Sequence, residues 1–227
     1  PDQILLRLDT ELGAFHPDVV VLAVFVGNDY GDLLRNKIFR LDEQGRLRPN
    51  PHELEASIRV ALELNDRTSV LVRALDALRP ALFGPDEASP YDLGKEGRYR
   101  LVDFWVENAR EEYEDTVVEE NPVVTNTHMD HYSGDLSLRP TSTSAVYRAR
   151  MMQAIIRRAR ERCRDHGVPL LLVGIPHPMD VSSAYPYAAV DRDEYPSYDP
   201  RNLMAPLAMV SRNDDIPFVD LQAVFTR

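Results

Sequence analysis

Residues 17–29 are PDVVVLAVFVGND, and this stretch decides the fold. Its eight consecutive apolar residues, 19–26, are mostly β-branched. Such a run is typical of a strand buried on both faces, as the central strands of a parallel sheet are. The run ends abruptly at Gly27, which favours a tight turn directly after the strand.

The sequence predicts two further strands of the same sheet, at 169–175 and at 217–221. A helix precedes the first of them, because apolar residues recur there at helical spacing: Ala145, Ala149, Met152, Ile156, Ala159 and Cys163. Ser and Thr at 141–144 supply a cap for its start, and Gly167 is suited to its end. Helices alternating with buried strands indicate an α/β fold with a parallel sheet.

Two shorter helical patterns flank this unit. Apolar residues at 4–12 predict a helix that closes at Gly13. Another pattern, at 203–210, leads into the third strand, although Pro206 weakens the prediction.

The segment between the first two strands is too long for a simple crossover, because 142 residues separate Val26 from Pro169. We expect residues 36–140 to form an inserted, mostly helical cap, and residues 1–35 and 141–227 to form the α/β core. Within the cap, the pattern predicts helices at 52–64, 67–79 and 98–113 and a hairpin that turns at Gln44-Gly45.

Composition narrows the possible functions. The net charge of −11 argues against a nucleic-acid partner, because affinity for nucleic acid comes largely from Lys and Arg side chains that neutralise the phosphates. The longest apolar run, 19–26, is much shorter than the roughly 18 residues that a membrane-spanning helix needs. The single cysteine, Cys163, excludes an internal disulfide, and we expect it to be buried. Composition indicates neither the compartment nor the oligomeric state.

The candidate site lies where the strands end, because ligands of open α/β sheets bind beyond the carboxyl ends of the strands. Gly27, Asn28 and Asp29 follow the first strand, and His177 and Asp180 follow the second as candidate pocket-lining residues. An Asn amide offers two uncharged N–H donors, which suit a developing oxyanion. Taken alone, Asn in a turn more often serves the backbone.

Residues 17–29 closely resemble the third conserved block of the SGNH hydrolases, the GDSL-type esterases. In that family the turn after a buried strand carries an Asn that donates to the oxyanion hole, so the resemblance implies this role for Asn28. The opening Pro1-Asp2-Gln3 resembles the stretch just after the family's second block, and residues 170–176 and 216–221 resemble its later strands. The resemblance implies a flavodoxin-like three-layer sandwich and a serine esterase that acts on a lipid, acylated-sugar or small ester. It implies no metal and no organic cofactor.

The sequence departs from the family at two essential places. The nucleophile's Gly-Asp-Ser block would precede Pro1, and the Asp-x-x-His block would follow residue 227. Two similar stretches do not replace the nucleophile: Gly31-Asp32-Leu33-Leu34 has Leu at the Ser position, and Gly134-Asp135-Leu136-Ser137 has the wrong order and follows no strand. We therefore expect a segment of a longer protein, inactive by itself, in which the strand at 19–26 has an unpaired apolar edge.

Two other classes of function remain open. One is a non-catalytic SGNH-like module that binds a glycan or assists in its modification. The other is a flavodoxin-like nucleotide or phosphate binder, which the acidic charge and the missing Gly-rich phosphate loop disfavour. A metal site around His128, Asp130, His131 and Asp135 is also disfavoured by its spacing. His177 is disfavoured as a replacement catalytic base.

Overall fold

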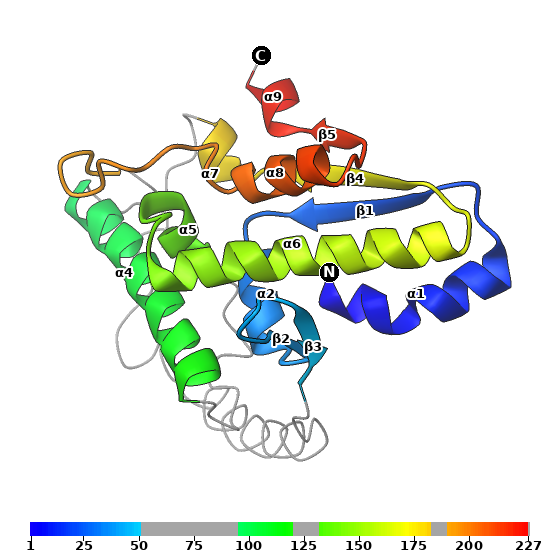
Figure 1. Cartoon of the computed structure of the whole chain (residues 1–227). Coiled ribbons are helices and arrows are strands. Elements are labelled where there is room, and N and C mark those ends of the chain that lie inside the picture. The colour runs from blue at the N-terminus through cyan, green and yellow to red at the C-terminus, as the bar shows by residue number, and fades with distance from the viewer. Residues whose placement is uncertain (51–94, 120–131, 183–189, 227) are drawn as a thin grey trace, which may run out of the picture.

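A parallel three-stranded sheet lies at the centre of the computed structural model, which describes residues 1–50, 95–119, 132–182 and 190–226 (Figure 1). β1 (Val20–Phe25) pairs along its whole length with β4 (Leu170–Ile175). β5 (Phe218–Asp220) pairs with the other edge of β4, so the strand order is β1-β4-β5. The predicted α/β fold with a parallel sheet is therefore confirmed.

The long helix α6 (Thr143–Asp165) forms where the sequence predicts it and uses the predicted caps. At its start, Ser142 Oγ accepts a hydrogen bond from the Ala145 N–H at 3.2 Å. At its end, Gly167 adopts a φ of 71°, a left-handed conformation that side chains disfavour. Five residues of the predicted stripe are buried, Ala149 is half-buried, and the burial of Cys163 is as predicted: the buried five are Ala145, Met152, Ile156, Ala159 and Cys163.

Two other helices differ in detail from their predictions. α1 (Asp2–Phe15) continues past Gly13 and ends at His16, whose φ of 46° is left-handed. α8 (Ala205–Asn213) carries Pro206 in its first turn, where backbone N–H groups have no intrahelical acceptor, so the N–H that proline lacks is not missed. The proline therefore begins this helix instead of weakening it.

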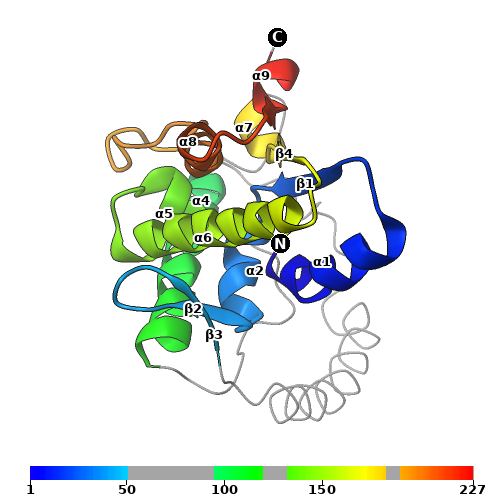
Figure 2. The ribbon, with the colours of Figure 1, turned by 45° about the vertical axis from the view of Figure 1, so that its right-hand side comes forward.

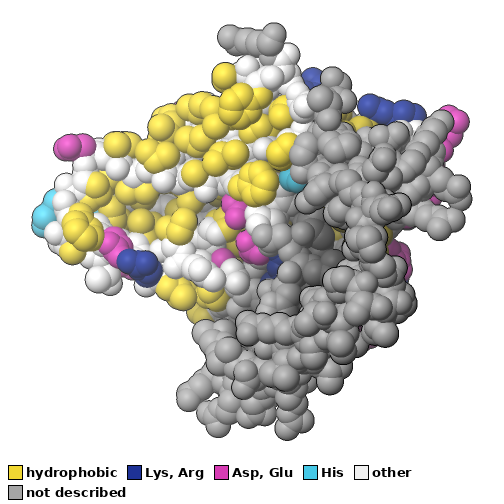
Figure 3. Space-filling model, turned by 180° about the vertical axis from the view of Figure 1, so that it is seen from behind, with side chains coloured by type: hydrophobic (Ala, Val, Ile, Leu, Met, Phe, Trp, Pro, Cys, Tyr) yellow, Lys and Arg dark blue, Asp and Glu magenta, His cyan; other side chains and the backbone are white. Residues whose placement is uncertain are grey.

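The described helices leave one face of the sheet uncovered. α6 and α8 pack on one face, and α1 packs beside α6 (Figures 1 and 2). Seen from behind, apolar side chains gather on the surface (Figure 3). In β1 and β5, Val21 and Val219 are 55% and 40% exposed. Only alternate residues of β1, Leu22 and Val24, enter the core. The expectation that residues 19–26 are buried on both faces is thus wrong for the described structure, which has helices on one face only.

β1 is an edge strand with a partly open backbone edge, as expected. In a parallel ladder, alternate residues of a strand bond to one neighbour. Val20 and Val26 donate to Pro169 and Ile175, so the even-numbered residues of β1 face β4. The odd-numbered residues therefore direct their N–H and C=O groups away from the sheet.

The described parts of the insertion include the predicted hairpin and one predicted helix. Between β1 and α6 the described residues form α2 (Asp29–Arg35), β2 (Phe39–Leu41), β3 (Leu47–Pro49), α4 (Lys95–Tyr113), the π-helix η1 (Glu114–Val118) and α5 (Gly134–Leu138). β2 and β3 are antiparallel, and Gly45 in their turn has a φ of 73°. The helices predicted at 52–64 and 67–79 lie outside the described residues.

A buried ion network joins the insertion to the core. Arg148 on α6 is completely buried, and its guanidinium lies 3.1 Å from Asp135 Oδ2 on α5 and 2.8 Å from Glu112 Oε2 on α4. It also donates to the Ala109 carbonyl at 2.6 Å. Glu112 in turn pairs with Arg35 on α2 at 3.0 Å. Four helices therefore meet at one cluster of opposite charges.

The two short helices that remain, α7 (Pro178–Val181) and α9 (Gln222–Phe225), each follow a strand of the sheet. Among the helices that the structure describes, none combines the length and the apolarity that crossing a membrane requires.

Candidate functional site

The predicted site residues of the first two strands meet at the carboxyl end of the sheet. Phe25 pairs with Ile175, so Gly27 and His177 each stand two residues beyond the same rung of the ladder. A Cβ atom at Gly27 would lie 2.7 Å from His177 Cδ2 and 2.6 Å from Phe25 Cζ. Only glycine therefore fits at this position without moving the rings beside it.

Asn28 keeps its side-chain amide available at this end of the sheet. It is the N-cap residue of α2, and its backbone carbonyl accepts from the N–H groups of Gly31 and Asp32 at 2.8 and 3.0 Å. Asn at this position commonly caps the helix with its side chain, but Asn28 does not. Within the residues that the structure describes, the half-buried amide makes no hydrogen bond. Its two N–H donors can therefore serve a ligand.

The side chain of Asp29 stabilises the turn after β1 and is not available to a substrate. Its Oδ2 atom accepts a hydrogen bond from the backbone N–H of Phe25 at 2.7 Å, on the edge of β1 that faces away from β4. The carboxylate closes a loop from the last residue of the strand to the first residue of α2. Burial raises the pKa of this carboxyl. The turn that presents Asn28 is thus fixed at both ends.

His177 lies beside Gly27 as an uncharged ring. Its ring packs against Tyr132 with the centroids 4.9 Å apart, and against Phe25 at 6.0 Å. Nδ1 accepts from the Met179 N–H at 3.2 Å, which places the proton of the neutral ring on Nε2. Burial lowers the pKa of His177 to about 4. A base of this strength is poorly matched to proton transfer near pH 7.

Asp180 is buried in a chain of hydroxyl groups, 7% exposed. Its Oδ1 accepts from the Tyr132 hydroxyl at 2.8 Å, and that hydroxyl lies 2.6 Å from Ser137 Oγ. Tyr132 has a single phenolic proton, so when its hydroxyl donates to Asp180, the Ser137 hydroxyl donates to Tyr132. Asp180 therefore holds Tyr132 in place, and the His177 ring packs against Tyr132.

Sequence reasoning missed Tyr132 and Ser137 as neighbours of the strand ends. The Ser133 N–H donates to the Gly27 carbonyl at 3.2 Å, which brings the start of the 132–138 segment onto the first turn of the site. The only sequence signal was the Gly134-Asp135-Leu136-Ser137 stretch, rejected as a nucleophile block. Ser137 is completely buried on α5, and Asp135 is bound to Arg148. Their roles in the described structure are packing and charge compensation.

The burial of Asp180 predicts a pH dependence of stability. Burial raises the pKa of Asp180 to about 7, although the bond from Tyr132 opposes the shift. Between about pH 4 and 7 the folded protein thus holds a proton that the unfolded chain releases, so stability falls as pH rises. Asp180→Asn removes this titration and keeps an acceptor for Tyr132. We expect the variant to gain up to about 1.4 kcal/mol of relative stability for each pH unit in this window.

Urea unfolding of both proteins at several pH values measures this gain. The difference between the variant and the parent should level off above pH 7, where Asp180 is ionised in both states. A difference that stays constant from pH 4 to 7 would contradict the assignment.

The described residues contain no group of three or more His, Cys, Asp or Glu side chains placed to hold a metal ion. His128, Asp130 and His131, considered above as metal ligands, lie outside the described part of the chain.

Comparison with known proteins gives no relative: no family model, no curated protein and no solved structure matches this chain.

Proposed function

We propose that this chain is a segment of an SGNH-type serine esterase that hydrolyses carboxylic esters, acetyl esters among them. The observation that carries the proposal is the amide of Asn28, which is half-buried and makes no hydrogen bond among the described residues. It stands directly after a strand of a parallel sheet, at the sheet end where α/β proteins bind ligands. In this proposal the complete fold is a three-layer sandwich with residues 36–140 as its cap.

The chemistry assigned to Asn28 is stabilisation of negative charge. A serine hydroxyl attacks the ester carbonyl, and a histidine, oriented by an aspartate, takes the serine proton and returns it to the leaving alcohol. The carbonyl oxygen becomes an oxyanion, which accepts hydrogen bonds from the Asn28 amide and from backbone N–H groups. Water then repeats the attack on the acyl-enzyme and releases the acid. The serine and the histidine belong, in this proposal, to segments outside residues 1–227.

The neighbours of Asn28 have supporting roles in this proposal. Gly27 gives the turn its close approach to His177, and Asp29 fixes the turn by its bond to the Phe25 N–H. The neutral ring of His177 packs against Tyr132, and in this proposal the two rings exclude water from the oxyanion.

The test begins with the coding sequence for roughly a hundred codons on either side. We expect a strand followed by Gly-Asp-Ser upstream and an Asp-x-x-His block downstream. The complete protein should hydrolyse 4-nitrophenyl acetate and be labelled by a fluorophosphonate at that serine, whereas residues 1–227 alone should do neither. A complete protein without the serine and histidine, and without hydrolysis, would instead favour the non-catalytic glycan-binding module.

A further inference from the structure

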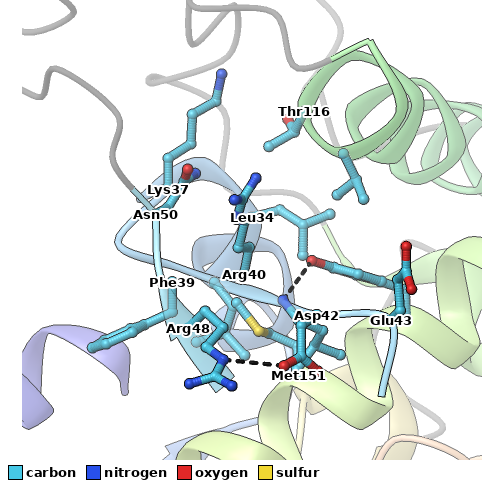
Figure 4. Close-up of a pocket in the computed structure, with 14 residues that line it drawn as sticks. Leu34, Lys37, Phe39, Arg40, Asp42, Glu43, Arg48, Asn50, Thr116 and Met151 are labelled. Atoms are coloured by element: carbon cyan, nitrogen blue, oxygen red, sulfur yellow. Dashed lines mark hydrogen bonds and ion pairs between the residues drawn. The ribbon is translucent and has the colours of Figure 1, made fainter. Parts of the chain in front are cut away.

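A cavity of about 640 Å³ lies between the β2–β3 hairpin, η1 and α6, at the opposite end of α2 from Asn28 (Figure 4). Charged side chains of both signs line it, and Arg48 pairs there with Asp42 at 3.0 Å. This lining therefore favours neither an anion nor a cation. The sheet end that carries Asn28 holds a group with a more definite consequence, the buried carboxyl group of α7.

The position of α7 depends on Asp180. This helix has four residues, and Asp180 is the only one of them that is buried. Its Oδ1 atom accepts the hydrogen bond from the Tyr132 hydroxyl at 2.8 Å. Pro178 is exposed, and Met179 and Val181 are half-buried. Because a helix this short has no stability of its own, the contacts of Asp180 decide whether it stays docked.

The second oxygen of Asp180 has no partner in the described part of the chain. Oδ2 is buried there and accepts no hydrogen bond. An ionised carboxyl group in this position keeps its charge on an oxygen that neither water nor a donor reaches. Burying such a charge costs more free energy than burying the neutral acid. In agreement with this geometry, burial raises the pKa of Asp180 to about 7.

The other titratable groups around Asp180 keep their charge states near neutral pH. Burial raises the pKa of Tyr132 well above its usual range and that of Tyr198 to about 12, so both phenols stay protonated. His177 stays neutral, because burial lowers its pKa to about 4. The helix α9, which packs against α7, has no titratable side chain. Arg192 lies over the Tyr198 ring, but among the described residues no cation acts on Asp180 itself.

We propose that protonation of Asp180 controls the docking of α7: the helix stays bound to Tyr132 while Asp180 carries a proton, and ionisation of Asp180 favours its release. Release brings the carboxylate into water, where its charge is solvated. It also separates the Met179 N–H from His177 Nδ1, which lie 3.2 Å apart in the docked state. The ring beside Gly27 then loses the bond that orients it. The proposal does not depend on the esterase assignment.

Amide hydrogen exchange, followed by NMR from pH 5 to 8, tests the proposal. The N–H groups of Met179 and Ser182 bond to His177 Nδ1 and to the Pro178 carbonyl, so they exchange when α7 is released. After correction for intrinsic exchange rates, the opening constant of the parent is divided by that of Asp180→Asn. This ratio should rise up to about tenfold for each pH unit as far as about pH 7 and then level off. Any proton that His177 takes up on release affects both proteins equally.

Tyr132→Phe keeps the ring and removes the hydroxyl group, so it should lower the protection of α7 at every pH. Asp193→Asn is the matched control, because it removes an exposed carboxylate outside α7, and it should behave like the parent. The amide of Ile156, in the buried part of α6, reports global unfolding and shows that each variant is folded.

Four results would overturn the proposal. The first is a ratio that stays constant with pH, and the second is unchanged protection of α7 in Tyr132→Phe. The third is exchange of the α7 amides at the intrinsic rate at every pH, which would mean that α7 is never docked. The fourth is exchange of these amides no faster than that of Ile156, which would tie the proton on Asp180 to global unfolding alone.

Discussion

Replacing Arg148 with methionine is expected to lower the free energy of unfolding by about 3–5 kcal/mol. The guanidinium is completely buried and compensates Asp135 and Glu112. Glu112 keeps Arg35 as a partner in the variant, but Asp135 loses its cation while it remains buried. An uncompensated buried charge must either be desolvated or take up a proton, and both cost free energy. Urea unfolding followed by circular dichroism measures the loss.

Arg150→Met is the matched control for this prediction. Arg150 lies on the same helix, two residues further on, and is exposed to solvent. Its replacement should change stability by no more than about 0.5 kcal/mol. Adding Asp135→Leu to the Arg148→Met protein should recover part of the loss, because it removes the stranded charge. If Arg148→Met and Arg150→Met were equally stable, the network would not have the energetic role assigned to it.

Asn28→Ala in the complete esterase is expected to lower kcat by about 10²–10³, with little change in KM. The amide contacts the oxyanion, which exists in the transition state and not in the bound ester, so its loss affects the chemical step rather than binding. Steady-state kinetics on 4-nitrophenyl acetate measure both constants.

Two further variants sharpen the Asn28 prediction. Asn28→Asp keeps the shape of the side chain but removes its N–H donors, so it should be at least as impaired as Asn28→Ala. Asn213→Ala, at the exposed end of α8, should leave kcat unchanged. An unchanged kcat in Asn28→Ala would exclude Asn28 from the oxyanion hole.

The sequence correctly predicted the features that short-range backbone preferences determine, namely helix caps and a hairpin turn. The caps of α6 at Ser142 and Gly167 and the hairpin turn at Gly45 follow from short-range backbone preferences, and all three are as predicted. The sequence also predicted that the residues after β1 and after β4 lie close together, because parallel strands end at the same edge of a sheet.

Features that depend on packing could not be predicted. The apolar run at 19–26 shows that a strand forms, but not which of its faces another layer covers. The bond between Tyr132 and Asp180 joins residues 48 positions apart, and no periodicity marks such a pair. The same is true of the charges around Arg148, which come from four different helices. Only the arrangement of the helices makes these groups neighbours.

The bare face of the sheet makes the colloidal behaviour of this protein sensitive to salt. Self-association is favoured by the exposed side chains of Val21 and Val219 and by the open edge of β1. The net charge of −11 opposes it, because molecules of like charge repel one another. That repulsion reaches about 10 Å at 0.1 M ionic strength and only about 3 Å at 1 M. Dilute buffers well above the isoelectric point of about 5.0 should therefore keep the protein dispersed, and concentrated salt should bring the sheets of different molecules together.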